Sequence, residues 1–561
     1  MSKLSTILIS CLMLSISTVF AQSTYIITGS GTQFNANKDG APVSNLQPIQ
    51  TVIDAIKVDA SGADCIIQFG NGTGTLNIGT ANISFDGGTT GEDWGLVTLT
   101  GKLTSAFVGY GKGAIYLIRG ASLNSKADVT NTAVSGTANA TFYNTSTGTL
   151  TISGGTVLLT SETGMAIGNS FTGKIQIVGG VVEARCANAI AVYSTAKGKV
   201  TVSGDAVITS CYSNRIGTIS IEDSDGASGT CLEITGGTVE NTYDDGCAIF
   251  NKSPAAINIS GGMIFAFCAV FNDESGTINI SGGTISGIFA VGNAESGTIN
   301  ISGGTVSGAY YAVGTVSGTI NISGGTVSGD YFAVGNFESG TINISGGTIS
   351  ATTGYAVSND DGSVIISGGT ISATTGYAVG NNTGTVTISG GIGFAYGTVV
   401  TDVIYGPFTV PPVNNAVLVA WNEAAGTTTY NAGTSDDIYK LPATATAVWA
   451  KQGDDSGIAV ANGANTGFIP LPVTITGVNI VETQGIASLK IFPNPTKGEL
   501  RVTSYELQVT GIEIFDVMGK KLLTSPLSLT SPETTLNIAH LPSGIYFLKI
   551  GNKTAKIIKN E

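Results

Sequence analysis

The side chains that could carry acid–base chemistry avoid the middle of this chain. Cleavage of a glycan needs a tuned pair of titratable groups, or a strong base beside groups that bind a uronate carboxylate. No Lys, Arg or His occurs between Lys252 and Lys440, and the only histidine, His540, is expected on the surface of the C-terminal segment. Serine is abundant, but without a histidine partner it cannot form a hydrolytic triad. We therefore predict no catalytic site, and an enzyme would depend on three upstream arginines: Arg119, Arg185 and Arg215.

Two pairs of neighbouring acids could hold a calcium ion. Asp244 and Asp245 form one pair, Asp360 and Asp361 form the other, and each lies beside glycine. Asp next to Gly is typical of a turn, and calcium needs several further oxygen ligands. The glycine-rich calcium repeat is absent, and so is the lysine of a phosphate-binding loop. We interpret these acids as turn residues and predict no metal site and no cofactor.

A four-residue block, Ile-Ser-Gly-Gly or a close variant, recurs along the chain. Its spacing is 25 to 32 residues at first and then settles at 21 and 22. A period of this length indicates a solenoid, in which each unit buries its apolar side chains against its neighbours. The blocks begin at Ile152, Ile177, Val202, Ile234, Ile259, Ile280, Ile301, Ile322, Ile344, Ile366 and Ile388.

Each unit contains three short strands separated by glycine-rich corners. Residues 277–281 alternate polar and apolar types, which points Ile278 and Ile280 to one face. After a Gly-Gly corner, residues 284–286 and 289–291 form two further strands. This pattern predicts an all-β fold, a right-handed parallel β-helix with about 21–25 residues per coil. The architecture resembles that of pectin-lyase-like proteins, a resemblance that implies a polysaccharide lyase or glycoside hydrolase as the alternative function.

A column of large side chains precedes Ala-Ile or Ala-Val in successive units. If the following valine faces inward, strict alternation places the aromatic ring inward as well, in an interior ladder. If the strand is reversed, the rings form an outward platform on which sugar rings can stack. We favour the interior, because valine rather than alanine should be buried. The column consists of Met165, Cys247, Cys268, Phe289, Tyr311, Phe332, Tyr355 and Tyr377.

A column of asparagines follows at the next corner of each unit. Stacked side-chain amides can hydrogen-bond along the axis of a solenoid and to the backbone groups of a corner. We therefore interpret the column as structural. It consists of Asn169, Asn272, Asn293, Asn336, Asn359 and Asn381, with Thr315 as the exception.

Two pairs of cysteines could be close in such a solenoid. Cys247 and Cys268 occupy the same position in adjacent coils, and Cys186 and Cys211 are 25 residues apart. Neighbouring coils are about 4.8 Å apart, within the range that a disulfide bridges. Disulfides persist after export. Bridged pairs and free, buried thiols are both open at this point.

The amino-terminal residues predict export and a capped solenoid. Lys3 followed by an apolar stretch and a small residue at Ala21 predicts a signal peptide over residues 1–21. Residues 22–62 are predicted to form an N-terminal cap with an amphipathic helix, because an open β-helix end would recruit other strands. The β-helix is predicted over residues 63–400. The apolar residues at helical spacing in the cap are Ile49, Val52, Ile53 and Ile56.

The last part of the chain contains four blocks in a fixed order, at residues 489–500, 512–520, 541–550 and 556–559. Alternating apolar residues and intervening turns predict a compact β-sandwich. The series resembles the type A C-terminal sorting domain of the type IX secretion system of Bacteroidetes. This resemblance implies that residues 488–561 engage the type IX machinery and its sortase. It also implies attachment of the remainder to surface lipopolysaccharide after cleavage.

Composition and charge limit the remaining functions. A net charge of −14 without a basic patch argues against nucleic acid as a partner.

Residues 401–475 are predicted to form a small β module or distal cap, and residues 476–487 a linker. We expect an extracellular or outer-membrane-surface adhesin, binding module or spacer, with a glycan or a protein as its ligand. Another hypothesis is binding to ice or a regular surface through the outward columns Thr284/Ser286, Thr305/Ser307, Thr326/Ser328, Thr348/Ser350 and Thr370/Ser372.

Overall fold

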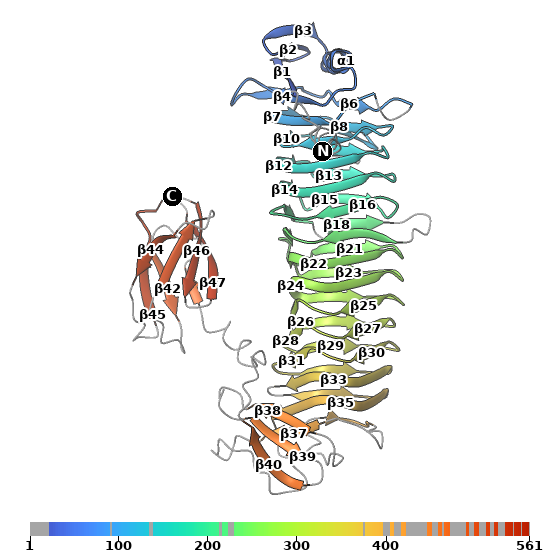
Figure 1. The fold of residues 1–561 in the computed structure, drawn as a ribbon, viewed down its shortest axis with the longest axis vertical. Helices are drawn as coiled ribbons and strands as arrows, with labels where there is room; N and C mark the ends of the chain where they lie inside the picture. Colours follow the sequence, from blue (N-terminus) through green and yellow to red (C-terminus); the bar gives the residue numbers. More distant parts are fainter. Residues whose placement is uncertain are drawn as a thin grey trace, which may run out of the picture. The chain divides into compact units, whose positions relative to one another are not determined.

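The computed structural model describes residues 22–408 except for 90–92, 134–138, 213–215, 223–228, 374–375 and 397–403. Beyond residue 408 it describes the strands β37–β47 and residues 538–541. The predicted signal peptide and the predicted linker lie outside the described residues. Within the described part, the strands β1–β37 form one hydrogen-bonded system of 37 strands, wound as a parallel β-helix (Figure 1).

The first face of the β-helix is the ladder of strands that, in the regular coils, carry the Thr-Ile-Asn-Ile sequence or a close variant. Each strand pairs in parallel with its equivalent one coil later, so that Ile280 pairs with Ile301 and Ile322 with Ile344. The side chains of Ile278 and Ile280 are buried in the core. The strands of this face are β1 (Ser23–Ser30), β4 (Cys65–Phe69), β7 (Val97–Ser105), β9 (Leu123–Ser125), β12 (Thr149–Leu159), β14 (Lys174–Ala184), β16 (Lys199–Val202), β19 (Thr230–Ile234), β22 (Ala256–Phe265), β24 (Thr277–Asn293), β25 (Thr298–Ile301), β27 (Thr319–Ile322), β30 (Thr341–Ile344), β33 (Ser363–Ala373) and β35 (Thr385–Tyr396).

The second face begins after a Gly-Gly corner in the regular coils. Gly283 at this corner has φ +84°, a conformation in which glycine avoids a steric cost. Strands β7, β12, β14, β22, β24, β33 and β35 run through the corner and contribute to both faces. The remaining strands are β5 (Thr75–Asn77), β10 (Asp128–Asn131), β17 (Val207–Ser210), β20 (Thr238–Asn241), β26 (Thr305–Thr315), β28 (Thr326–Gly329), β31 (Thr348–Ala351) and β37 (Val417–Trp421).

The third face carries the predicted aromatic and asparagine columns. The C-terminal parts of β24 and β26 belong to it. Its other strands are β6 (Ile83–Asp86), β8 (Lys112–Ile118), β11 (Asn139–Asn144), β13 (Thr163–Asn169), β15 (Asn188–Thr195), β18 (Gly217–Glu222), β21 (Cys247–Lys252), β23 (Cys268–Asn272), β29 (Phe332–Asn336), β32 (Tyr355–Asn359), β34 (Tyr377–Asn381) and β36 (Ile404–Tyr405).

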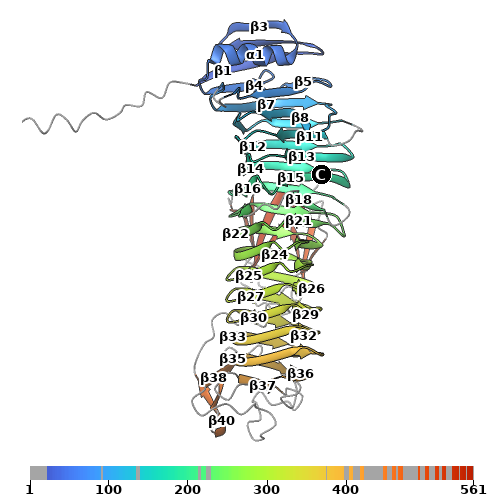
Figure 2. The ribbon, with the colours of Figure 1, turned by 90° about the vertical axis from the view of Figure 1, so that its right-hand side faces the viewer.

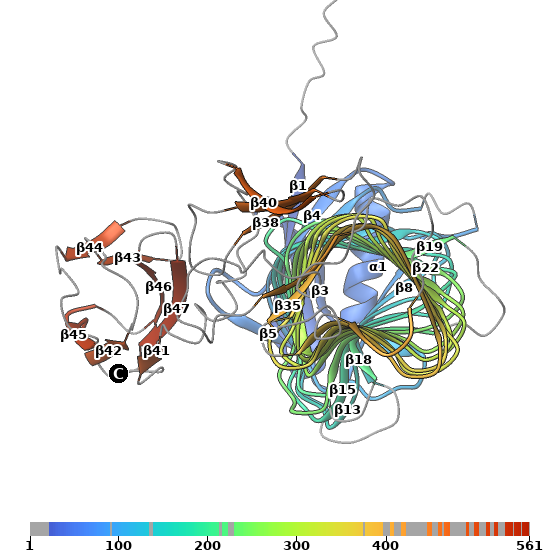
Figure 3. The same ribbon diagram turned by 90° about the horizontal axis from the view of Figure 1, so that it is seen from below.

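One end of the β-helix is closed by the helix α1 (Ile49–Ala60), which lies across the outline of the coils (Figures 2 and 3). Its residues Ile49, Val52, Ile53 and Ile56 are buried in the same core as the coils. The helix begins after Pro48 and ends where the Ser61 backbone N–H donates to the Lys57 carbonyl oxygen. Strands β2 (Gln33–Lys38) and β3 (Ala41–Gln47) extend β1 in antiparallel fashion beside the helix.

The β-helix continues past residue 400, where we predicted its end. Strand β36 pairs in parallel with β34, and β37 pairs with β35, so a further coil reaches Trp421. The repeat is hidden there because the next Ile-Ser-Gly-Gly block is missing. Most of the predicted module over residues 401–475 lies outside the described residues. Three later strands form a sheet of their own: β38 (Thr446–Ala450), β39 (Ile458–Asn462) and β40 (Asn465–Leu471).

The C-terminal segment contains two antiparallel sheets. One consists of three strands in the order β41–β42–β45, and the other of four strands in the order β44–β43–β46–β47. The sandwich that we predicted from these strands stays a prediction. Their bounds are β41 (Lys490–Phe492), β42 (Glu499–Thr503), β43 (Ile512–Asp516), β44 (Lys521–Ser525), β45 (Glu533–Asn537), β46 (Gly544–Ile550) and β47 (Lys553–Lys559). His540 lies outside these strands and is exposed.

Candidate functional site: an outer aromatic ladder

The arginines on which an enzyme would depend are held by acids. Arg119 binds Asp86 through two hydrogen bonds, and Arg185 binds Glu183 through two, at 2.7 and 3.0 Å. The Arg119 guanidinium holds the pKa of the Asp86 carboxyl below its usual range. Both groups of this pair are therefore charged near neutral pH and unsuited to proton transfer. Arg215 lies outside the described residues.

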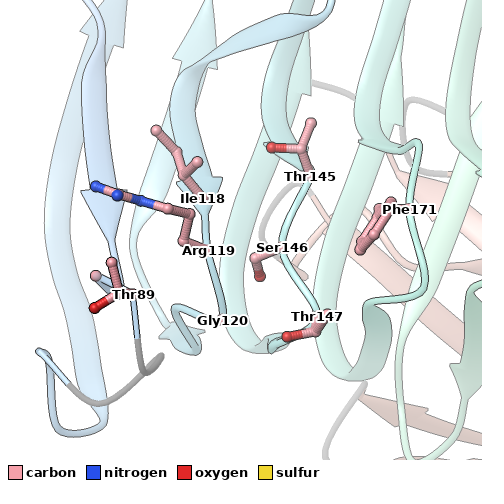
Figure 4. A pocket seen from close by; sticks show the side chains of 9 residues that line it. Thr89, Ile118, Arg119, Gly120, Thr145, Ser146, Thr147 and Phe171 are labelled. Carbon is pink, nitrogen blue, oxygen red and sulfur yellow. The ribbon is translucent and has the colours of Figure 1, made fainter.

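Arg119 lines a surface pocket of about 440 Å3 together with Thr145, Ser146 and Phe171. Figure 4 shows its side chain extending over the neighbouring coil, away from these three residues. The hydroxyl of Ser146 is also engaged, because it donates to the Ala121 carbonyl oxygen at 3.0 Å. The pocket therefore presents no strong base to a substrate among its described residues.

The acidic pairs lie in exposed corners. The Asp361 carboxylate accepts a hydrogen bond from the Thr383 hydroxyl at 3.2 Å, and the Asp360 carbonyl oxygen accepts another at 2.9 Å. Asp244 and Asp245 are exposed in a turn. Among the described residues, no group of three His, Cys, Asp or Glu side chains is placed to hold a metal ion.

The predicted aromatic column is in register but lies outside the core, so the interior prediction was wrong. Phe289 pairs with Tyr311, Phe332 with Tyr355, and Tyr355 with Tyr377. Their side chains are half-buried. The column contacts neighbouring rings of adjacent coils instead of the isoleucines of the core.

A bend in each strand explains why the strict alternation of inward and outward side chains gave the wrong side for the aromatic column. Ala290 and Val291 are consecutive, yet both are fully buried. The pairing between coils includes Phe289 and Val291 but skips Ala290. Two consecutive side chains of the strand therefore point inward, so that Phe289 before them and Gly292 after them both face outward. A Cβ atom on Gly292 would come within 3.2 Å of the Tyr311 hydroxyl, so the ring column lies across these glycines.

A second column of rings, which our sequence analysis missed, lies beside the first. Tyr310 and Tyr331 directly precede Tyr311 and Phe332 in the sequence, and they are 45% and 43% exposed. The ring of Tyr310 meets that of Phe332 at 87°, and the ring of Tyr331 meets it at 70°. The doubled aromatics Tyr310-Tyr311 and Tyr331-Phe332 were the signal in the sequence.

The two columns form one continuous surface along the β-helix. At one end Phe267 contacts Phe289 at 5.1 Å between ring centroids, and at the other Tyr405 contacts Tyr377 at 5.5 Å. Tyr405 is 52% exposed. We call this surface the aromatic ladder. It consists of Phe267, Phe289, Tyr310, Tyr311, Tyr331, Phe332, Phe337, Tyr355, Tyr377 and Tyr405.

The surroundings of the ladder are acidic. Asp330 and Glu338, which adjoin Tyr331 and Phe337, are exposed. The whole segment between Lys252 and Lys440 contains no cationic side chain. The ladder is thus an apolar strip bordered by scattered carboxylates.

The asparagine column behind the ladder is structural, as predicted. The Asn272 side-chain amide donates to the Asn293 side-chain oxygen at 3.0 Å and to the Gly276 carbonyl oxygen at 3.0 Å. Asn251, which we had not included, donates to Asn272 at 2.8 Å. Thr315 interrupts this series, and its hydroxyl accepts from the Gly318 backbone N–H. These bonds satisfy buried corner groups and fix the spacing of the coils.

A second amide column lies on the first face. Asn321 donates to Asn300 at 2.8 Å, and Asn343 donates to Asn321 at 2.8 Å. The Thr/Ser columns of the second face are also in register, as in the pairs Thr284–Thr305 and Ser286–Ser307. The last member, Ser372, differs from the others because it is buried.

No disulfide joins any two of the six cysteines of the described residues. Cys247 and Cys268 pair in register on adjacent coils and pack with Phe250 in a small cluster outside the main core. Cys186 and Cys211 are out of register by one residue, since Ala184 pairs with Ser210. The bridged alternative therefore has no support in this structure.

The comparisons with known proteins concern the C-terminal segment. Residues 490–560 match the family model described as secretion system C-terminal sorting domain. This segment is a sorting domain of the type IX secretion system. The sorting domain engages the type IX machinery and directs the protein to the cell surface or the extracellular space. Comparison with curated proteins and with solved structures gave no match.

No helix among the described residues has the length and apolar character needed to cross a membrane.

Proposed function

We propose that this type IX secretion substrate is a non-catalytic binding protein whose β-helix presents the aromatic ladder to a ligand outside the cell. The observation that carries the proposal is the ladder itself. Its rings contact one another from coil to coil, while Tyr310, Tyr331 and Tyr405 remain about half exposed. A contiguous exposed apolar surface of this kind marks an interaction site more often than a passive surface.

The chemistry around the ladder supports binding rather than turnover. General acid–base catalysis needs groups whose pKa values are tuned by burial or by charged neighbours. Asp330, Glu338 and Asp360 are exposed at corners, and no cationic side chain occurs between Lys252 and Lys440. These residues offer hydrogen-bond acceptors, but the segment has no cationic side chain that could bind a uronate carboxylate or stabilise the negative charge of a transition state.

The sorting domain supports a display role. We propose that a sortase of the type IX machinery removes it upstream of residue 490 and that the β-helix is attached to surface lipopolysaccharide. The β-helix would then act as a rigid carrier that holds the ladder away from the membrane.

The proposal is tested by applying the full-length protein to immobilised plant, algal and host polysaccharides. Retention is measured together with new reducing or unsaturated ends. We expect retention on at least one polysaccharide, lost in the Tyr310→Ala/Tyr331→Ala variant, without new ends. The matched control is Tyr110→Ala/Tyr243→Ala, which removes two exposed tyrosines outside the ladder. New chain ends that accumulate with time would favour an enzyme instead.

A further inference from the structure

We infer that the aromatic ladder binds an uncharged polysaccharide chain that lies parallel to the axis of the β-helix. This inference rests on the proposed binding function and adds the chemical class and the direction of the ligand.

The spacing of the ladder favours a polymer with one ring-sized unit per coil. Ring centroids of successive coils lie 4.8 Å apart for Phe289 and Tyr311, and 5.5 Å apart for both Tyr310–Tyr331 and Tyr355–Tyr377. An extended peptide places side chains of one face about 6.6 Å apart, so it loses register with the coils after a few residues. A pyranose with its linking oxygen advances by about one coil. A sugar chain can therefore keep one unit on each coil along the ladder.

The side chains of the ladder match the two kinds of surface that a sugar presents. Their aromatic carbons contact C–H groups, and the tyrosine hydroxyls both donate and accept hydrogen bonds. Tyr310, Tyr331 and Tyr405 bring such hydroxyls to the exposed side of the ladder. Burial raises the pKa of Tyr355 further above its ordinary value, so this phenol keeps its proton well above neutral pH. The ladder thus offers neutral hydrogen-bonding groups on adjacent coils.

The carboxylates beside the aromatic ladder argue against a polyanion as its ligand, and their irregular spacing argues against a polycation. Asp330 and Glu338 would repel an anionic chain, and no cation of the segment compensates them. The carboxylates do not recur from coil to coil either. Gly308, Gly329 and Ala351 are in register, so the positions that follow them are Ala309, Asp330 and Thr352. A polycation would therefore find isolated partners, whereas hydroxyl groups can use single carboxylates as acceptors.

The test measures the affinity of the full-length protein for soluble polymers of known charge. The neutral probes are glucomannan, xyloglucan and hydroxyethyl cellulose; the charged probes are polygalacturonate, alginate and polylysine. We expect binding to a neutral probe that is insensitive to salt and strengthens with oligosaccharide length, since longer chains cover more coils. Tyr310→Ala/Tyr331→Ala should weaken it at least about tenfold, because buried aromatic contacts dominate such interfaces.

A second variant keeps the test valid if the alanine variant does not fold. Tyr310→Phe/Tyr331→Phe retains the rings and removes two hydroxyls, so it should fold normally and bind a few-fold more weakly. Tyr110→Ala/Tyr243→Ala should bind as the wild type does. Ladder-dependent binding to polygalacturonate, alginate or polylysine alone would overturn the ligand class and leave the binding function intact. If no probe shows ladder-dependent binding, both the ligand class and the binding function of the ladder are overturned.

Discussion

Tyr310 and Tyr331 lie on adjacent coils with their ring centroids 5.5 Å apart and their planes 18° from parallel. Both rings also meet Phe332, at centroid distances of 5.7 and 4.4 Å. Each exposed tyrosine is thus braced by a half-buried ring of the neighbouring column. This bracing fixes the exposed rings before a ligand arrives, which lowers the entropy lost on binding.

The two sides of one strand should respond differently to a new carboxylate. Ile322 is buried in the core, so Ile322→Asp places an unpaired charge there and should lower the free energy of unfolding by about 4 kcal/mol. Asn321 is half-buried, and Asn321→Asp loses the hydrogen bond donated to Asn300 but can still accept from Asn343. We expect a cost of about 1 to 2 kcal/mol. Chemical unfolding of both variants decides, and equal losses would contradict the assigned faces.

The interruption of the buried amide column by Thr315 suggests a stabilising change. Thr315→Asn would supply an amide that can bond to Asn293 and Asn336, as the asparagines of other coils do. We expect a gain of about 1 kcal/mol in the free energy of unfolding. The matched reverse change is Asn336→Thr, which removes the bonds to the Gly340 backbone and should destabilise by about 1 to 3 kcal/mol. A loss of stability in Thr315→Asn would show that the column tolerates no amide there.

Two buried cysteines should make the protein less stable in alkali. Burial raises the pKa of Cys65 and of Cys231 from 9.0 to about 11. Between these values the folded chain retains protons that the unfolded chain has lost. The contribution to stability is therefore complete below pH 9 and is lost as the pH rises toward 11, by up to about 2 kcal/mol for each thiol.

Unfolding midpoints across this pH range provide the measurement. Cys65→Ala and Cys231→Ala should each flatten the decline. The control Ile259→Val changes a buried side chain without a titrating group and should keep the wild-type slope. If the unfolding midpoint of both cysteine variants falls with pH as steeply as that of the wild type, the two buried thiols are not the cause of the alkaline loss of stability.

The sorting domain should be required for export but not for folding of the β-helix. The coils from β1 to β37 are one hydrogen-bonded system, and strands β41–β47 form separate sheets. Deletion of residues 488–561 should therefore leave a folded β-helix inside the cell envelope. Cell fractionation and protease protection measure this outcome. Surface display of the truncated protein at the wild-type level would contradict the sorting role.

The repeat made the coil register predictable. Ile280, Ile301 and Ile322 follow one another at constant spacing, and a parallel β-helix satisfies its backbone only when equivalent residues stack. The buried asparagines followed from the same argument. The coil that contains Ile404 and Trp421 was missed, because its Ile-Ser-Gly-Gly block is absent and only strand pairing identifies it.

The sequence predicted that the rings of the candidate site stack on successive coils, but not that they lie on the outer side of the strand. Alternation correctly buried Val291, yet it failed for Phe289 because Ala290 is buried as well. A local bend of this kind depends on the shape of the coil, which single-strand periodicity does not contain. The second column, which consists of Tyr310 and Tyr331, was visible in the sequence as pairs of consecutive aromatic residues. These rings can contact the first column only if that column also faces outward.

Protection of individual tyrosines by a bound polysaccharide distinguishes binding along the aromatic ladder from binding elsewhere on the protein. Hydroxyl-radical footprinting of the full-length protein, with and without a saturating neutral polysaccharide, reports the reactivity of each exposed ring. We expect Tyr310, Tyr331 and Tyr405 to become protected while Tyr110 and Tyr243 keep their reactivity. Protection of Tyr110 or Tyr243 with unchanged reactivity along the ladder would contradict this expectation.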